Sequence, residues 1–312
     1  MSLPLDLLIR PAREPIRRWV LSAFPRADTG SADTGSLDYD HPRGDPGLFG
    51  PHSATWRVHS DFPGMLAGGL AALTLQTLHP LALAGVGDHS NFRGDLIGRL
   101  RRTTAFVGGT TYAPRAQAEA LIEQVRQIHG HITGMGEDGR AYAADDPALL
   151  TWVHVSEAYC FLQGYRRYGH VALPAGAADR YYDEVRRIAE ALGAREVPAS
   201  EREVADYFRR IQPGLAYTER SRVVLGLLAK VRLSVPAAAL SRDLFLHAGR
   251  ALLPDWAIAM LGHTPWQRQL ARLAARGLWS IAPVFRAALR DGIASRACRR
   301  VDVTPEQLQH WT

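Results

Sequence analysis

The chain has 312 residues, of which 46% are hydrophobic and 22% are charged, so it is long enough to bury one large core or two smaller ones. Its formal net charge is +6, but nearly all of the basic residues are scattered arginines, and Lys230 is the single lysine. This scatter disfavours a nucleic-acid interface, which gathers basic residues on one face. The two cysteines, Cys160 and Cys298, exclude a disulfide framework.

The first 44 residues differ in character from the rest of the chain. Prolines and charges interrupt the apolar residues up to Phe24, which disfavours a secretory signal and favours a cytoplasmic protein. Residues 27–36 read ADTGSADTGS and predict a surface loop or a disordered strap. We therefore predict an N-terminal helix and polar flexible segment over residues 1–44, and one large helical domain over residues 45–312.

Two stretches follow that are open to more than one interpretation. Residues 54–58, ATWRV, are the best strand candidate in a sequence with few strand signals. Residues 62–87 are long and apolar enough to suggest a membrane span. Gln76, His79 and two prolines instead favour a buried core helix, kinked at Pro80, although peripheral membrane contact stays open.

The rest of the chain is a succession of helical patterns. Residues 92–109 predict a helix that ends at paired glycines, and Pro114 begins another that runs to about Gly134. A helix over residues 145–169 has Pro147 in its first turn. Further helices are predicted over 177–194, 200–211, 217–232, 236–252, 254–262 and 265–289. The sequence therefore predicts an all-α protein.

The helix over residues 92–109 carries a candidate anion site. Arg99 and Thr103 lie four residues apart and share one helix face, which Arg102 borders. A guanidinium binds a carboxylate in fork geometry, and a hydroxyl adds a donor. A solvated basic face is the alternative, and the spacing leaves both open.

Three helices carry candidate histidines. His129 and His131 are two residues apart, about 200° around a helix axis, so at most one of them can face a core. His154 and Glu157 lie three residues apart in a nearly apolar helix and could hold a metal or a polarised imidazole. His79 lies in the most apolar stretch. Imidazoles and arginines among apolar helices suit a haem pocket.

Three blocks of sequence, residues 50–112, 125–134 and 139–169, occur in an order and spacing that resemble the MpaB-type oxygenase family. That family includes the latex-clearing rubber oxygenases. The resemblance covers roughly residues 45–270 and implies an all-helical protein with a globin-like core that holds b-type haem. It further implies activation of dioxygen on a small apolar substrate.

The resemblance also implies roles for particular residues. The Arg-x-x-x-Thr motif of the family matches Arg99 and Thr103, which would lie beside the haem. Its His-x-x-Ile/Val-x-Gly block matches His129, which would be the proximal iron ligand, with His154 as the second candidate. His79 would line the cofactor site.

The chain departs from the rubber oxygenases in two places. Arg102 stands where those enzymes carry a lysine, and residues 75–95 contain no glutamate where they carry a base. Because arginine rarely gives up its proton, Arg102 would shape the distal cavity rather than bind iron, and a substrate other than polyisoprene is implied.

Two other functions stay open at this point. The missing glutamate is consistent with a haem- or lipid-binding helical protein without turnover. The His154–Glu157 pair, together with His129, is consistent with a non-haem metal enzyme.

Overall fold

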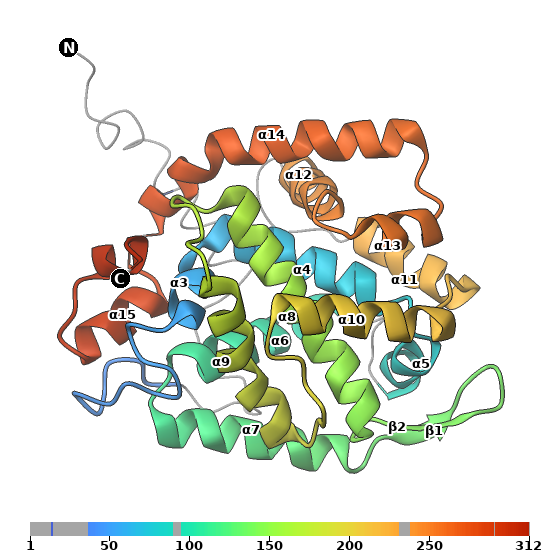
Figure 1. Ribbon diagram of the computed structural model, residues 1–312, viewed down its shortest axis with the longest axis horizontal. Helices are drawn as coiled ribbons and strands as arrows, with labels where there is room; N and C mark the ends of the chain where they lie inside the picture. Colours follow the sequence, from blue (N-terminus) through green and yellow to red (C-terminus); the bar gives the residue numbers. More distant parts are fainter. Residues whose placement is uncertain (1–13, 15–36, 90–94, 231–237, 290, 312) are drawn as a thin grey trace.

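The structure, a computed structural model, describes residue 14 and residues 37–89, 95–230, 238–289 and 291–311 (Figure 1). The described residues are predominantly helical, with one small two-stranded sheet, which confirms the all-α prediction. The predicted N-terminal helix and the polar repeat lie outside the described residues.

The elements follow the chain in this order: α3 (Ala54–Ser60), α4 (Phe62–Gln76), α5 (Pro80–His89), α6 (Leu96–Tyr112), α7 (Arg115–His129), β1 (Thr133–Met135), β2 (Ala141–Ala143), α8 (Pro147–Tyr168), α9 (Ala177–Leu192), α10 (Glu201–Ile211), η1 (Gln212–Gly214), α11 (Glu219–Lys230), α12 (Ala238–Arg250), α13 (Asp255–Met260), α14 (Pro265–Ala288), α15 (Ile293–Arg300) and η2 (Pro305–Gln309). The two strands pair in antiparallel register. Helices α15 and η2 and both strands were not predicted.

The stretch predicted as one kinked helix over residues 62–87 forms two helices, α4 and α5. Pro80 is the first residue of α5 and has no N–H to donate to the carbonyl of Gln76. That carbonyl accepts instead from the N–H of His79 at 3.2 Å, which turns the chain between the two helices.

Residues 54–58, the best strand candidate in the sequence, lie in helix α3 instead. The side chain of Ser53 caps this helix by accepting from the N–H of Trp56 at 3.1 Å. Glu184 on α9 accepts from the N–H groups of Ala54 at 3.1 Å and Thr55 at 2.8 Å. The carboxylate therefore satisfies backbone donors that the first turn of a helix leaves unpaired.

Two predicted helix ends are also displaced. The paired glycines Gly108 and Gly109 do not end α6, which continues to Tyr112. They admit a close neighbour instead, since a Cβ on Gly109 would lie 2.3 Å from Cδ1 of Leu121 on α7. Helix α7 ends at His129 rather than near residue 134, and the chain continues into β1.

Several helices begin directly after a residue whose side chain caps the first turn. Asp146 caps α8 by accepting from the N–H of Ala148 at 2.7 Å, and Ser200 caps α10 by accepting from the N–H of Glu203 at 3.2 Å. The carboxylate of Glu203 accepts from the N–H of Ala199 at 2.8 Å. In a capping box this carboxylate would accept from the N–H of Ser200 itself, but here it accepts from the residue before the cap.

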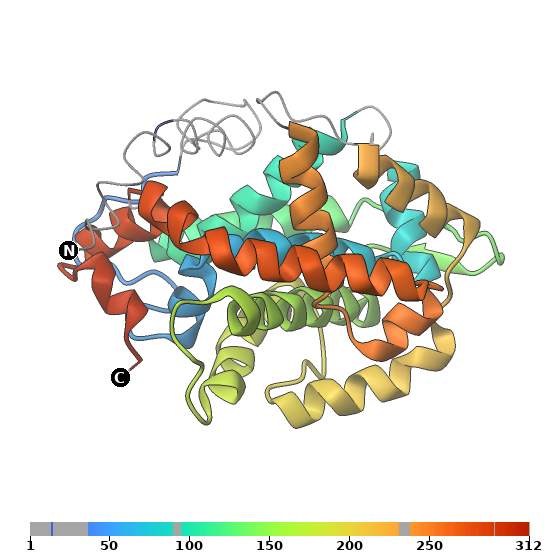
Figure 2. The same cartoon turned by 90° about the horizontal axis from the view of Figure 1, so that it is seen from above.

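Helix α4 lies at the centre of the molecule and packs against α8, α12 and α14 (Figure 2). Its glycines allow α8 to approach to backbone contact: a Cβ on Gly164 would lie 2.2 Å from the carbonyl oxygen of Gly64. A Cβ on Gly68 would lie 2.7 Å from the carbonyl oxygen of Cys160, a fully buried residue. The apolar sequence of α4 is therefore explained by burial in the core.

Within the described ranges, no helix has the length and apolar character needed to cross a membrane.

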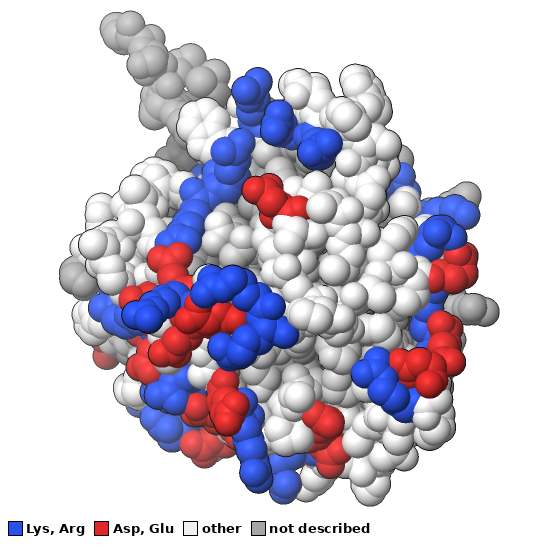
Figure 3. Space-filling view, turned by 45° about the vertical axis from the view of Figure 1, so that its right-hand side comes forward, with Lys and Arg blue, Asp and Glu red and all other residues white. Residues whose placement is uncertain are grey.

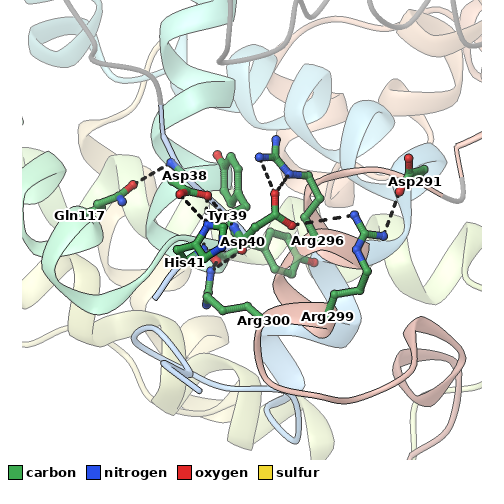
Figure 4. A network of polar contacts seen from close by, with 10 residues as sticks. Asp38, Tyr39, Asp40, His41, Gln117, Asp291, Arg296, Arg299 and Arg300 are labelled. Atoms are coloured by element: carbon green, nitrogen blue, oxygen red, sulfur yellow. Dashed lines mark hydrogen bonds and ion pairs between the residues drawn. The ribbon is translucent and has the colours of Figure 1, made fainter. Parts of the chain in front are cut away.

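The segment before α3 is attached to α15 by arginine contacts (Figure 4). Arg300 is fully buried and donates to the carbonyl oxygens of Tyr39 at 2.9 Å and Tyr112 at 2.8 Å. Arg296 pairs with Asp40 at 2.8 Å. The domain boundary predicted in this segment stays a prediction.

Candidate functional site

Helix α8 carries two ionisable side chains, His154 and Glu157, on one inner face. Both side chains are half-buried and are surrounded by many protein atoms. Burial lowers the pKa of His154 to about 4 and raises the pKa of Glu157 to about 7. A hydrogen bond with Gln76 and the charge of Arg99 lower the pKa of Glu157 and partly offset the effect of burial. Near neutral pH the imidazole is therefore neutral and the carboxyl is partly protonated.

Helix α6 directs Arg99 inward and Arg102 outward. Arg99 is half-buried, and burial lowers its pKa, as does the charge of Arg102, whereas Glu157 raises it. Its guanidinium makes no hydrogen bond or ion pair with any residue that the structure describes. Thr103 is half-buried one turn further along. Arg102 is exposed and pairs with Asp95 at 3.3 Å, so it does not join the inner group.

The two histidines at the end of α7 differ in exposure, as expected from their spacing. His129 is half-buried, whereas His131 is exposed. The Nδ1 atom of His129 is buried and has no hydrogen-bond partner among the described residues. Burial lowers the pKa of His129, Asp145 raises it, and Arg99 lowers it.

Arg99 thus lies close enough to His129 and to Glu157 to affect the pKa of both. The structure therefore brings together side chains from α6, α7 and α8 that are far apart in the sequence. We refer to this group as the buried polar cluster, which consists of Arg99, His129, His154 and Glu157.

His79 lies apart from the buried polar cluster, in the turn between α4 and α5. Its Nδ1 accepts from the N–H of Ala82 at 3.3 Å, and its ring centre lies 5.9 Å from that of Trp152. Burial lowers its pKa to about 4, and the charges that act on it belong to Arg140 and Asp146. These two residues lie on either side of β2, so His79 faces the β-hairpin end of the molecule.

One buried histidine was missed in the sequence. His59 on α3 places Nδ1 at 2.8 Å from the hydroxyl of Thr111 and Nε2 at 3.0 Å from the hydroxyl of Tyr181. Burial lowers its pKa to about 3, and the charge of His154 lowers it further. His59 therefore lies on the α3 side of the buried polar cluster. It was missed because the preceding residues were interpreted as a weak strand.

The residues of the cluster can be tested against the cofactors that the sequence suggested. In the part of the chain that the structure describes, no three His, Cys, Asp or Glu side chains are placed to hold a metal ion. His129, His154 and Glu157 do not form such a group among the described residues. A haem needs one protein ligand on iron and a cation for its propionates. The orphaned Nδ1 of His129 and the guanidinium of Arg99 are groups of these two kinds, and buried polar groups are normally hydrogen-bonded.

The structure is thus an all-α protein in which imidazole, guanidinium and carboxyl side chains from α6, α7 and α8 lie near one another. Residues 56–287 match the family described as ER-bound oxygenase mpaB/B'/Rubber oxygenase, catalytic domain, and the chain belongs to this family. The predicted resemblance is therefore confirmed, and the matched range includes the whole buried polar cluster. No curated protein and no solved structure matches the chain.

Proposed function

We propose that this protein is a haem-dependent oxygenase that activates dioxygen on a small apolar substrate, with haem b held beside α6, α7 and α8. The observation that carries the proposal is the state of Arg99. Its half-buried guanidinium has no hydrogen bond or ion pair within the described residues, although it lies near His129 and Glu157. A buried cation without a paired anion is costly, and a haem propionate would supply that anion.

Each residue of the cluster has a part in this proposal. His129 would bind the iron, because burial keeps its imidazole neutral and its Nδ1 has no other partner. Arg99 would bind a propionate, and the hydroxyl of Thr103, one turn away, would add a donor. When bound, haem supplies the iron at which dioxygen is activated. His154 is the second candidate ligand.

Glu157 is the group in the cluster that can exchange a proton near neutral pH. Its pKa of about 7 leaves the carboxyl able to hold or release a proton at its oxygen atoms. Gln76 hydrogen-bonds to this carboxyl and would keep it in position. The apolar side chains of α4 and α8 would exclude water, which suits an apolar substrate.

Absorption spectra of the purified protein, supplemented with haem, test this assignment. The wild type is expected to show a Soret band, and His129→Ala is expected to lose or shift it. His131→Ala is the matched control, because this histidine is two residues away and exposed. Arg99→Gln is expected to weaken haem binding, whereas Arg102→Gln removes only an exposed ion pair and is expected to leave it unchanged.

Other outcomes would change the proposal in defined ways. Loss of the Soret band in His154→Ala, but not in His129→Ala, would move the iron ligand to α8. Bound haem with no oxidation of any isoprenoid or fatty substrate would favour a binding protein without turnover. Iron without porphyrin would contradict the proposal and support a non-haem enzyme.

A further inference from the structure

Helix α14 lies on the outside of the molecule, along the top in Figure 1 and across the face seen in Figure 2. Its inner side packs on α12 and α4 through small or apolar residues, and the buried ones include Ala271, Ala275, Leu278 and Ala282. Its outer side exposes large apolar side chains, which are Trp266 at 68%, Leu273 at 47%, Trp279 at 62% and Ile281 at 38%. Exposure of two tryptophans on one helix marks this surface as a contact site.

The charges of α14 are all of one sign. The helix contains four arginines and no Asp or Glu. Arg286 is used inside the fold, where it pairs with Asp61 at 2.5 Å. Arg268, Arg272 and Arg276 are exposed, and their guanidinium groups make no hydrogen bond or ion pair with any residue in the described ranges.

Several exposed arginines on other helices are paired with an acidic residue of their own helix. Arg126 pairs with Glu123 on α7, and Arg115 pairs with Glu119 on the same helix. Arg209 pairs with Asp206 on α10. Figure 3 shows positively charged side chains along the top of the molecule, where α14 runs, whereas both signs are mixed lower down. The positive charge of α14 is therefore not neutralised by its own neighbours.

We propose that the outer side of α14 binds the headgroup region of an anionic lipid bilayer, with the helix lying in the plane of the surface. Trp266 and Trp279 are 13 residues apart. This spacing places them about 140° apart around the helix axis, with Arg272 and Arg276 between them. Guanidinium groups bind lipid phosphates, and tryptophan rings prefer the depth of the headgroups. Surface-bound helices combine these same two kinds of residue.

A second copy of this chain is a poorer occupant for the same surface. Two α14 helices would bring arginines to face arginines, because neither helix has an acidic residue to offer. A bilayer supplies phosphate for the arginines and an apolar layer for the tryptophans at the same time. The contact is a peripheral one, and it requires no haem, so it is independent of the proposed oxygenase activity.

Cosedimentation of the full chain with lipid vesicles tests the proposal. The wild type is expected to bind vesicles of phosphatidylcholine containing about 30% phosphatidylglycerol, and not vesicles of phosphatidylcholine alone. A variant with Arg268→Gln, Arg272→Gln and Arg276→Gln is expected to bind roughly 100-fold more weakly, since each basic residue near an anionic surface contributes about fivefold. A variant with Trp266→Ser and Trp279→Ser is also expected to bind more weakly.

A control variant separates the local surface from the net charge. Arg115→Gln, Arg126→Gln and Arg209→Gln together remove the same charge from exposed positions on other helices, and this variant is expected to bind like the wild type. Equal weakening in the control, or equal binding to both kinds of vesicle, would overturn the proposal. A dimer in solution that the Trp variant dissociates, with no vesicle binding by the wild type, would overturn it as well and assign the surface to a second copy.

Discussion

The hydroxyl of Tyr181 on α9 donates to Nε2 of His59 on α3 across 3.0 Å. The direction of this bond follows from the other side of the ring. Thr111 donates its one hydroxyl hydrogen to the carbonyl of Val107 at 2.7 Å, so it must accept from Nδ1–H of His59 at 2.8 Å. His59 is therefore neutral with its hydrogen on Nδ1, which agrees with a pKa lowered to about 3 by burial.

Removing that hydroxyl tests the bond. Tyr181→Phe leaves the buried Nε2 of His59 without a donor, and we expect a loss of about 1–3 kcal/mol in the free energy of unfolding, measured with urea. Tyr207→Phe is the matched control, because the hydroxyl of Tyr207 is buried and has no partner among the described residues. Its removal is expected to be neutral or stabilising. Equal losses in the two variants would contradict the assigned bond.

The raised pKa of Glu157 predicts a dependence of stability on pH. The carboxyl has a pKa of about 7 in the folded protein and an ordinary value of 4.5, so between these pH values only the folded state holds the proton. The folded state therefore loses about 3 kcal/mol as pH rises through this window. His59 and His154, with pKa values of about 3 and 4 against 6.5, act in the opposite direction and stabilise as pH rises towards 6.5.

Because the two effects overlap, a variant is needed to separate them. Glu157→Gln removes the carboxyl and keeps the shape, so its stability relative to the wild type is expected to improve steadily between about pH 5 and pH 7 and then level off. Unfolding by urea across this range measures the difference. Stability curves that run parallel for the two proteins would show that Glu157 has an ordinary pKa.

Local sequence signals were sufficient to predict most of the helices and the residues at which they begin. Asp146 and Ser200 cap their helices through atoms two or three residues away, so a short window contains the whole interaction. The first turn of α3 depends in part on Glu184, which is 129 residues from Thr55 in the sequence. A local sequence pattern cannot predict a contact between residues this far apart, and the stretch was therefore interpreted as a strand candidate.

In the candidate site, too, local sequence patterns predicted some features, and contacts between distant residues determined the others. The spacing of Arg99 and Thr103 left both an anion site and a solvated face open, because a helix pattern does not reveal what covers each side. Tertiary packing leaves Arg99 half-buried and Arg102 exposed beside Asp95, a difference that the spacing alone does not predict. His59 escaped notice for a related reason, since its partners come from α6 and α9 and are assembled only by the fold.

The crossing of α4 and α8 provides the last prediction. Gly164→Ala would place a Cβ 2.2 Å from the carbonyl oxygen of Gly64, and only backbone movement can relieve that overlap. We expect a loss of about 3 kcal/mol in unfolding free energy, together with weaker binding of the proposed haem, because α8 also carries the candidate site residues His154 and Glu157. Gly226→Ala on α11, where a Cβ meets nothing within 4 Å, is expected to gain about 0.5–1 kcal/mol. A Gly164→Ala protein as stable as the wild type would mean that the two helices do not approach this closely.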